Sequence, residues 1–286
     1  MNAVTVEVIR DDGRCFLIDN KSWKIKSDGL EGFDFVEPEV TSEPNAYGDG
    51  SRLVASRVND KDRTVSAVYK GSLSEKANQR EVVRSFFNHK RSYKLVVEYM
   101  GMKKACEGYL YHFSLPTANI HRNLELTFTL LCTQPYMLSY DDFAKNIAQV
   151  DGGLEFDFEI PEEGTDFGHY TFNQTVIIEN DGDVGTDMKV VLRATGPVTN
   201  PKLIKDDKFV RIIDTMKSGD EITIDLISKP CKITKNGVNI IGKTDRMSSF
   251  SKMAIDVGMN KISYNADDGY NNLEVYLYYN ERYLGL

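Results

Sequence analysis

Residues that build metal centres and disulfide frameworks are scarce in this sequence. The cysteines are Cys15, Cys106, Cys132 and Cys231, and the histidines are His89, His112, His121 and His169. No Cys-x-x-Cys pair and no His-Glu-x-x-His motif occurs among them. A structural zinc site needs clustered ligands, and scattered cysteines are typical of thiols in a reducing compartment. We therefore expect neither a bound metal nor a disulfide framework.

Long hydrophobic runs are also absent. The mean hydropathy is −0.38, and no apolar stretch reaches the ~20 residues that a membrane-spanning helix needs. Residues Met1–Glu7 have neither the basic start nor the apolar centre of a secretory signal. We expect a protein that is made in a cytosol and that stays there or leaves by a route such as cell lysis.

Catalytic and ligand-binding motifs are missing as well. No Gly-x-Ser-x-Gly sequence surrounds a serine, and no glycine-rich phosphate loop precedes a helix. Residues Asp181–Asp187 carry acids at the first, third and seventh positions of a calcium-loop pattern. The pattern fails because Gly185, Thr186 and Leu192 occupy positions that need Asp or Asn, Gly and Glu. We expect no cofactor, and an enzyme is the least supported class.

The charge is unevenly distributed along the chain, whose net charge is −8. Residues 1–137 hold 19 Lys and Arg against 18 Asp and Glu, a net charge of +1. Residues 138–286 hold 16 against 25, a net charge of −9. This difference indicates a domain boundary near residue 137. An acidic second half argues against a nucleic-acid-binding protein, whose affinity depends on neutralising phosphates.

Tyrosine and phenylalanine are abundant, at fifteen and fourteen residues, and both favour strands. In the first half, alternating apolar and polar residues predict strands at 5–10, 15–18, 63–70, 93–100, 106–113 and 124–130. Hairpin turns are expected at Asp12-Gly13 and at Gly101. Residues 37–52 are predicted to be a loop, which at that length is typical of a functional or mobile segment.

One helix is expected in the first half, at about Glu75–Asn88. Ser74 is the predicted N-cap. An apolar cluster of Val82, Val83, Phe86 and Phe87 occupies the second half of this helix, so the helix buries one end and exposes the other. The first half of the chain is therefore expected to be a β-barrel-like domain with one α-helix.

The second half shows strand signals every 8–12 residues. They lie at 175–178, 188–192, 209–213, 221–227, 231–234, 238–241, 260–264 and 272–279. Asn236-Gly237 is the strongest hairpin signal among the intervening turns. This spacing predicts an antiparallel β-sandwich. The alternating segment Leu154–Ile160 carries acids on one face, which keeps an edge strand soluble or, alternatively, supplies the carboxylate pair of a glycosidase.

Three groups of segments together resemble the distal tail protein family of siphophages. The first group is Tyr47–Ser51, Asp62–Tyr69, Phe86–Asn88 and Tyr93–Leu95. The second group is Asn180–Val184, Val190–Leu192 and Gly196–Leu203. The third group is Ser218–Asp225, Lys235–Asn239, Ser248–Phe250, Gly258–Asn260 and Tyr279–Gly285. Their order and spacing extend the resemblance along nearly the whole chain.

The resemblance implies a structural virion protein of the phage tail tip or baseplate, assembled in the host bacterial cytoplasm and used in host attachment. Residues 1–137 would form a homohexameric ring around the tail channel, and residues 138–286 a galectin-like β-sandwich outside it. The implied partners are further copies of the chain, the tail tube protein and the tail-tip hub protein. Neither a membrane nor a specific nucleic acid is implied.

The long loop and the exposed part of the helix are the predicted contacts between neighbouring copies. The candidate interface residues are Tyr47, Gly48, Asp49, Gly50, Ser51, Lys76 and Arg80. Two alternatives stay open. One is the matching component of a phage-derived, tail-like particle. The other is a carbohydrate-binding or adhesin module that uses the sandwich face and its tyrosines, which are Tyr264, Tyr270, Tyr276, Tyr278 and Tyr279.

Overall fold

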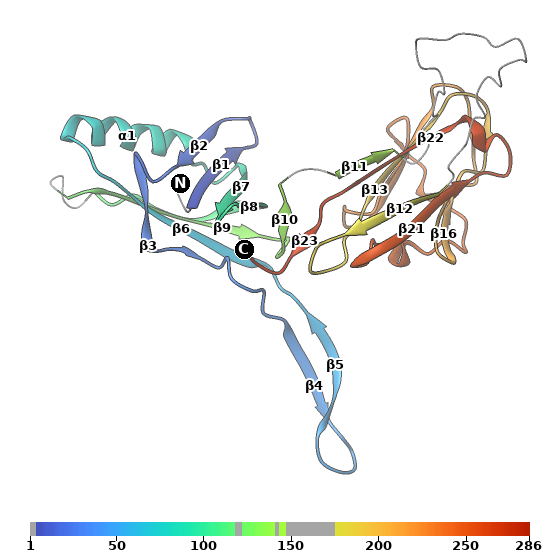
Figure 1. Ribbon diagram of the computed structural model, residues 1–286, viewed down its shortest axis with the longest axis horizontal. Helices are drawn as coiled ribbons and strands as arrows, with labels where there is room; N and C mark the ends of the chain where they lie inside the picture. The colour runs from blue at the N-terminus through green and yellow to red at the C-terminus, as the bar shows by residue number, and fades with distance from the viewer. Residues whose placement is uncertain (1–3, 118–121, 141–142, 147–174) are drawn as a thin grey trace, which may run out of the picture. The chain divides into compact units, whose positions relative to one another are not determined.

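The computed structural model describes residues 4–117, 122–140 and 175–286 and the backbone of residues 143–146. Over these ranges the chain is mainly β, with one α-helix and several antiparallel sheets, as predicted. It divides into two compact units (Figure 1). Unit 1 comprises Met1–Tyr140 and Arg282–Leu286, and unit 2 comprises Asp141–Glu281. The predicted strand at Leu154–Ile160 lies outside the described residues.

Unit 1 is built on one antiparallel sheet. Its strands are β1 (Val4–Arg10), β2 (Cys15–Ile18), β3 (Trp23–Glu31), β6 (Lys61–Tyr69), β7 (Ser92–Tyr99), β8 (Met102–Ser114), β9 (Leu124–Cys132), β10 (Met137–Ser139) and β23 (Arg282–Tyr283). The main order is β2-β1-β7-β8-β9-β6-β3, and β10 pairs with both β8 and β23. The edge strands β2 and β3 are consecutive in the chain and contact each other. The sheet therefore curls around its core, which gives the barrel-like form that was expected.

Both predicted hairpins of unit 1 are present. Strands β1 and β2 pair from Val6–Ile18 to Ile9–Cys15, and β7 turns into β8 through Met100 and Gly101. Strand β3 was not predicted, because polar residues and a bulge interrupt its alternation. At Gly29 a Cβ would lie 2.5 Å from the carbonyl oxygen of Ser66, so only glycine fits this bulge.

The expectation of a loop over residues 37–52 is wrong in part. Residues Glu39–Pro44 form β4 and Ser51–Arg57 form β5, which pair as an antiparallel hairpin. We call residues 39–57 the arm; Figure 1 shows it extending beyond β3 and β6. Every residue of β4 and β5 is exposed. With no buried face, these strands carry no apolar alternation that would identify them in the sequence.

Helix α1 (Leu73–Phe86) covers the core of unit 1. Its N-cap is Ser72 rather than the predicted Ser74, because Ser72 and Glu75 form a reciprocal capping box. Val83, Phe86 and Phe87 are buried as expected, whereas Val82 is 43% exposed. The Phe87 and Phe128 rings lie 4.7 Å apart, so aromatic packing fixes the helix to β9.

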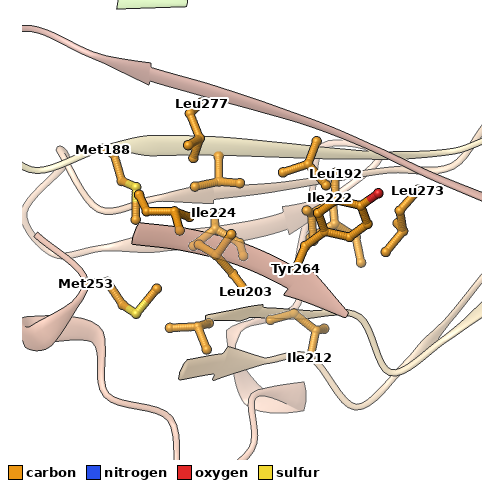
Figure 2. Packing of buried hydrophobic residues seen from close by; sticks show 14 of the residues in the cluster. Met188, Leu192, Leu203, Ile212, Ile222, Ile224, Met253, Tyr264, Leu273 and Leu277 are labelled. Carbon is orange, nitrogen blue, oxygen red and sulfur yellow. The ribbon is translucent and has the colours of Figure 1, made fainter. Parts of the chain in front are cut away.

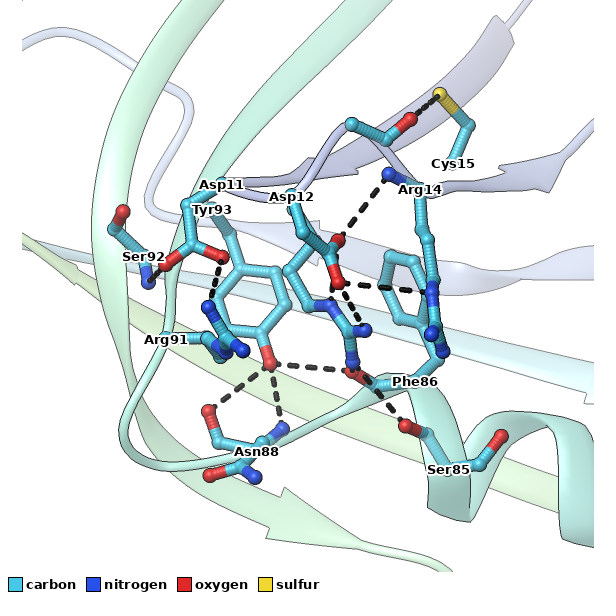
Figure 3. A network of polar contacts seen from close by, with 12 residues as sticks. Asp11, Asp12, Arg14, Cys15, Ser85, Phe86, Asn88, Arg91, Ser92 and Tyr93 are labelled. Carbon is cyan, nitrogen blue, oxygen red and sulfur yellow. Dashed lines mark hydrogen bonds and ion pairs between the residues drawn. The ribbon is translucent and has the colours of Figure 1, made fainter.

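A polar network fixes the C-terminal end of α1 to β1 and β7 (Figure 3). The buried Arg10 guanidinium donates to the carbonyls of Ser85 at 3.2 Å and Phe86 at 2.8 Å. Asp12 accepts from the same guanidinium, at 2.9 Å from Nε. The Tyr93 hydroxyl donates to the Asn88 carbonyl at 3.0 Å. A cation near the last helical carbonyls is favourable because those carbonyls carry partial negative charge.

Unit 2 contains two main antiparallel sheets. The larger has the order β11 (Phe143–Asn146), β22 (Leu273–Tyr279), β13 (Lys189–Ala194), β18 (Glu221–Asp225), β19 (Lys232–Lys235) and β20 (Val238–Asn239). The smaller has the order β12 (Thr175–Asn180), β21 (Gly258–Asn265), β15 (Lys202–Lys205) and β16 (Lys208–Arg211). Strands β14 (Val198–Thr199) and β17 (Thr215–Met216) pair separately, and 3-10 turns span Ile241–Lys243, Phe250–Lys252 and Tyr270–Asn272.

The core of unit 2 lies between these sheets (Figure 2). Leu192, Ile222, Ile224 and Leu277 enter it from the larger sheet, and Tyr264 from the smaller. The eight predicted strand segments of this half each contain a strand, and Asn236-Gly237 turns β19 into β20 with both residues at positive φ. The short strands β11, β14, β15 and β17 were not predicted. Two facing antiparallel sheets around one core form the β-sandwich that was expected.

Candidate assembly surfaces

The arm exposes apolar side chains along its length. Val40, Leu53 and Val54 are 58%, 65% and 50% exposed, and Tyr47 is 95% exposed. Leu53 and Val54 lie at a bulge, because Thr41 pairs with Ala55 and Ser42 with Leu53, which leaves Val54 as the extra residue. A two-stranded hairpin is marginally stable in water by itself. Burial of these side chains against another surface would therefore stabilise the arm.

Ion pairs across the two strands hold the arm in register. Arg57 donates from Nε at 3.0 Å and from Nη2 at 2.9 Å to the Glu39 carboxylate. Asn59 donates to the same carboxylate at 3.1 Å. Hydrogen bonds from Asn59 and Arg57 therefore lower the pKa of the Glu39 carboxyl. Nearer the tip, Arg52 lies 2.9 Å from Glu43. Exposed pairs of this kind contribute less than about 1 kcal/mol each, so they favour the register without making the arm self-sufficient.

The tip of the arm presents Tyr47. The Asn45 backbone N–H donates to the Gly50 carbonyl and its side-chain amide donates to the Asp49 carbonyl, both at 3.1 Å. Gly48 and Gly50 adopt φ angles of +86° and +92°, a conformation that side-chain-bearing residues rarely adopt. The structure therefore brings the predicted interface residues 47–51 together at one exposed turn, with Ser51 opening β5.

The two predicted helix residues belong to a separate surface. Lys76 and Arg80 lie on α1 and line a cavity of about 250 Å³ together with Leu73, Ala77 and Leu124. The Arg80 guanidinium donates to the carbonyls of Leu115 and Pro116, each at 3.0 Å. Arg80 thus connects the helix to the segment after β8, a role that the sequence did not indicate. The arm and α1 lie on different parts of unit 1 (Figure 1).

The sequence missed Val40, Leu53 and Val54 as candidate contact residues. The only signal was the pair Leu53-Val54 in an otherwise polar stretch after the Gly48–Ser51 turn. An apolar pair beside a turn is common in buried strands, so the sequence alone does not identify a contact surface. The pair indicates a contact surface only because the structure shows that both side chains are exposed.

The root of the arm is joined to the last residues of unit 1. The Val36 backbone N–H donates to the Leu284 carbonyl at 2.9 Å, and the Leu286 N–H donates to the Phe33 carbonyl at 3.0 Å. Lys104 donates to the Gly285 carbonyl at 2.9 Å. Residues 284–286 are therefore bonded both to residues 33–36 and to Lys104 of β8, although these segments lie far apart in the sequence.

Among the described residues, no group of three or more His, Cys, Asp or Glu is placed to hold a metal ion. No helix in these ranges is long and apolar enough to cross a membrane. The neighbouring Cys106 thiol and the buried Arg63 guanidinium lower the pKa of the Cys132 thiol. The two cysteines are 1% and 0% exposed, so this thiol pair is not accessible to a substrate.

Comparison with known proteins gives a family match in unit 2 and a fold match along the whole chain. Residues 181–283 match the family described as siphovirus-type tail component, C-terminal domain. The crystal structure of the distal tail protein (Dit) of phage SPP1 aligns with a TM-score of 0.64 at 10% identity, covering 97% of this chain and 98% of that one. That protein is described as a paradigm of the hub adsorption apparatus in phages that infect Gram-positive bacteria.

Two structures of the phage P2 baseplate, in its activated conformation with Ca and with Sr, align at a TM-score of 0.54 and 10% identity. Each covers 97% of this chain and 98% of the matching chain. A search of curated proteins finds no match.

These findings define a class: residues 181–283 match a siphovirus-type tail component domain, and the chain has the fold of a phage distal tail protein. The domain match in unit 2 and the fold of the chain both agree with the resemblance to distal tail proteins that the sequence predicted.

Proposed function

We propose that six copies of this chain form a ring that joins the tail tube to the tail-tip hub during host attachment. Unit 1, with residues 1–137 as its main part, forms the ring, and the sandwich of residues 138–286 lies outside it. The partners are neighbouring copies, the tail tube protein on one side and the hub protein on the other. The observation that carries this proposal is the arm, whose apolar side chains are exposed in the single chain.

The arm supports a ring because it would make a heterologous contact, in which one surface of a copy meets a different surface of the next copy. A strand of seven residues spans roughly 23 Å, so β5 is long enough to cross onto a neighbouring copy. A contact between one surface and a different surface of the next copy repeats around a rotation axis and closes into a ring. The arm and α1 are two such different surfaces on unit 1. Burial of Tyr47, Val40 and Leu53 on the next copy removes apolar area from water and stabilises the ring.

Substituting the exposed apolar residues of the arm tests this mechanism. The variant carries Val40→Ser, Leu53→Ser and Val54→Ser, which leave unit 1's core untouched because all three side chains are exposed. We expect this variant to keep the wild-type circular dichroism spectrum and to lose the ring in size-exclusion light scattering and negative-stain images. Tyr111→Ser is the matched control, since Tyr111 is 68% exposed on β8, away from the arm. Rings of normal size and yield from the arm variant would rule out the arm as the neighbour contact.

A further inference from the structure

The outer face of the larger sheet of unit 2 carries a second exposed cluster. Residues on this face alternate with those that enter the core, because successive side chains of a strand point to opposite sides. Lys189 pairs with Tyr278, and Val191 pairs with Tyr276, across β13 and β22. Arg193 pairs with Glu221 across β13 and β18. These six residues, which we call the tyrosine face, line a depression of about 310 Å³.

The tyrosine face combines aromatic rings with an apolar floor. Tyr278 is 38% exposed and Tyr276 is partly exposed, whereas Val191 between them is 8% exposed and forms the floor. Tyr279, the next residue along β22, points the other way and is buried in the core. The two exposed tyrosines are therefore not required to fill the sandwich core.

Polar contacts hold the other side of the depression in a defined geometry. Arg193 Nη2 lies 3.2 Å from Glu221 Oε2, and the Arg193 guanidinium carbon lies 5.7 Å from the centre of the Tyr276 ring. The Tyr276 hydroxyl donates to Glu274 at 3.2 Å. The Arg193–Glu221 hydrogen bond uses one of the five guanidinium N–H donors and one carboxylate oxygen. The other guanidinium N–H groups of Arg193 and the second carboxylate oxygen of Glu221 therefore remain as donors and acceptor beside the Tyr276 ring.

The charges around the depression include no excess of cations. Lys189 and Arg193 are positive, whereas Glu221, Glu274 and Asp225, which pairs with Lys189, are negative. Such a site gives no net attraction to phosphates or other polyanions, whose binding depends on an excess of cations. Adjacent donors and acceptors match a group that both donates and accepts hydrogen bonds, and hydroxyls have that property. A flat aromatic ring matches the C–H face of a sugar ring.

We propose that the tyrosine face binds a neutral saccharide, with a pyranose ring against Tyr276 and Tyr278 and adjacent sugar hydroxyls on Arg193 and Glu221. The depression lies on the outer face of a sheet, which fits part of an extended polysaccharide rather than an enclosed monosaccharide. This activity goes beyond the proposed ring. It requires only the fold of unit 2, so a full chain that fails to form rings still tests it.

Binding of neutral oligosaccharides to the full chain tests this inference directly. The probes are maltohexaose, chitohexaose and lactose, measured by saturation-transfer NMR and by calorimetric titration, with a hyaluronan hexasaccharide as the anionic comparison. We expect saturable binding of at least one neutral probe in the millimolar range or tighter, and weaker binding of the anionic one. Tyr276→Ala and Arg193→Gln are expected to weaken binding about tenfold or more, which corresponds to the loss of one good contact.

Two control variants separate recognition from folding. Tyr276→Phe keeps the aromatic ring and is expected to bind within a few fold of the wild type. Tyr109→Ala removes a tyrosine that is 56% exposed in unit 1 and is expected to leave saccharide binding unchanged. The proposal is overturned if none of the neutral probes binds saturably, if hyaluronan binds more tightly than all of them, or if Tyr109→Ala weakens binding as much as Tyr276→Ala.

Discussion

Two buried tyrosines, one in each unit, differ in how their hydroxyls are satisfied. The Tyr93 hydroxyl accepts from the Asn88 backbone N–H and donates to the Asn88 carbonyl at 3.0 Å (Figure 3). The Tyr264 hydroxyl is buried in the sandwich core, and the described residues offer it no hydrogen-bond partner. A buried polar group without a partner costs free energy, whereas a satisfied one contributes to stability.

This difference predicts opposite effects of the same substitution. Tyr264→Phe should leave the free energy of unfolding unchanged or raise it by about 1 kcal/mol, because it removes an unpaired hydroxyl. Tyr93→Phe should lower the free energy of unfolding by about 1 kcal/mol, because the Asn88 N–H loses its acceptor. Urea unfolding of both variants measures these changes. A larger loss for Tyr264→Phe than for Tyr93→Phe would contradict this assignment.

The Arg10–Asp12 pair predicts a pH dependence. The hydrogen bond from the Arg10 guanidinium holds the pKa of the Asp12 carboxyl well below its usual value of about 3.9. A lowered pKa in the folded state means that Asp12 stabilises the fold above its unfolded pKa and that this contribution is lost as the pH falls through the folded pKa. We expect Asp12→Asn to be less stable than the wild type at pH 7. The difference should begin to shrink below about pH 4, because the unfolded chain then binds a proton at Asp12 that the folded chain does not. Unfolding midpoints measured between pH 3 and pH 7 test this prediction, and a difference that grows towards acid pH would contradict it.

At the scale of elements, the root of the arm depends on close backbone contact. A Cβ at Gly285 would lie 3.0 Å from the carbonyl carbon of Asp34, which is closer than ordinary contact. Gly285→Ala should therefore push residues 284–286 away from residues 33–36. We expect faster hydrogen exchange at the Val36 and Leu286 amides, whose hydrogen bonds join these segments. Gly242→Ala is the control, because a Cβ there meets nothing within 4 Å. Unchanged exchange at both amides in Gly285→Ala would show that the root tolerates the methyl group.

The sequence predicted elements that bury one face and missed those that do not. Strands β1, β7 and β9 alternate because one face enters the core, and Asn236-Gly237 specifies its turn locally. The arm was expected to be a loop because both of its faces are exposed. The N-cap is Ser72 and not the predicted Ser74, because only Ser72 lies three residues before Glu75, the spacing that a capping box needs.

At the scale of the whole molecule, the candidate interface could be predicted only in part. Residues 47–51 were found because Gly48 and Gly50 indicate a turn, and the turn is the tip of the arm. Arg80 was selected as an exposed helix charge, but it hydrogen-bonds to the carbonyls of residues 115 and 116. The return of residues 282–286 to unit 1 depends on pairing between β10 and β23, which are remote in the sequence and too short to carry a pattern.

The measurement that most directly tests the proposed function is the mass of the wild-type assembly in solution, by native mass spectrometry together with negative-stain imaging of the same sample. Six copies of the 32.4 kDa chain predict a species of about 194 kDa, or twice that mass for two stacked rings, with a central hole in the images. A chain that remains a monomer at concentrations of about 100 µM, and that forms no rings on tail tubes, would contradict the account.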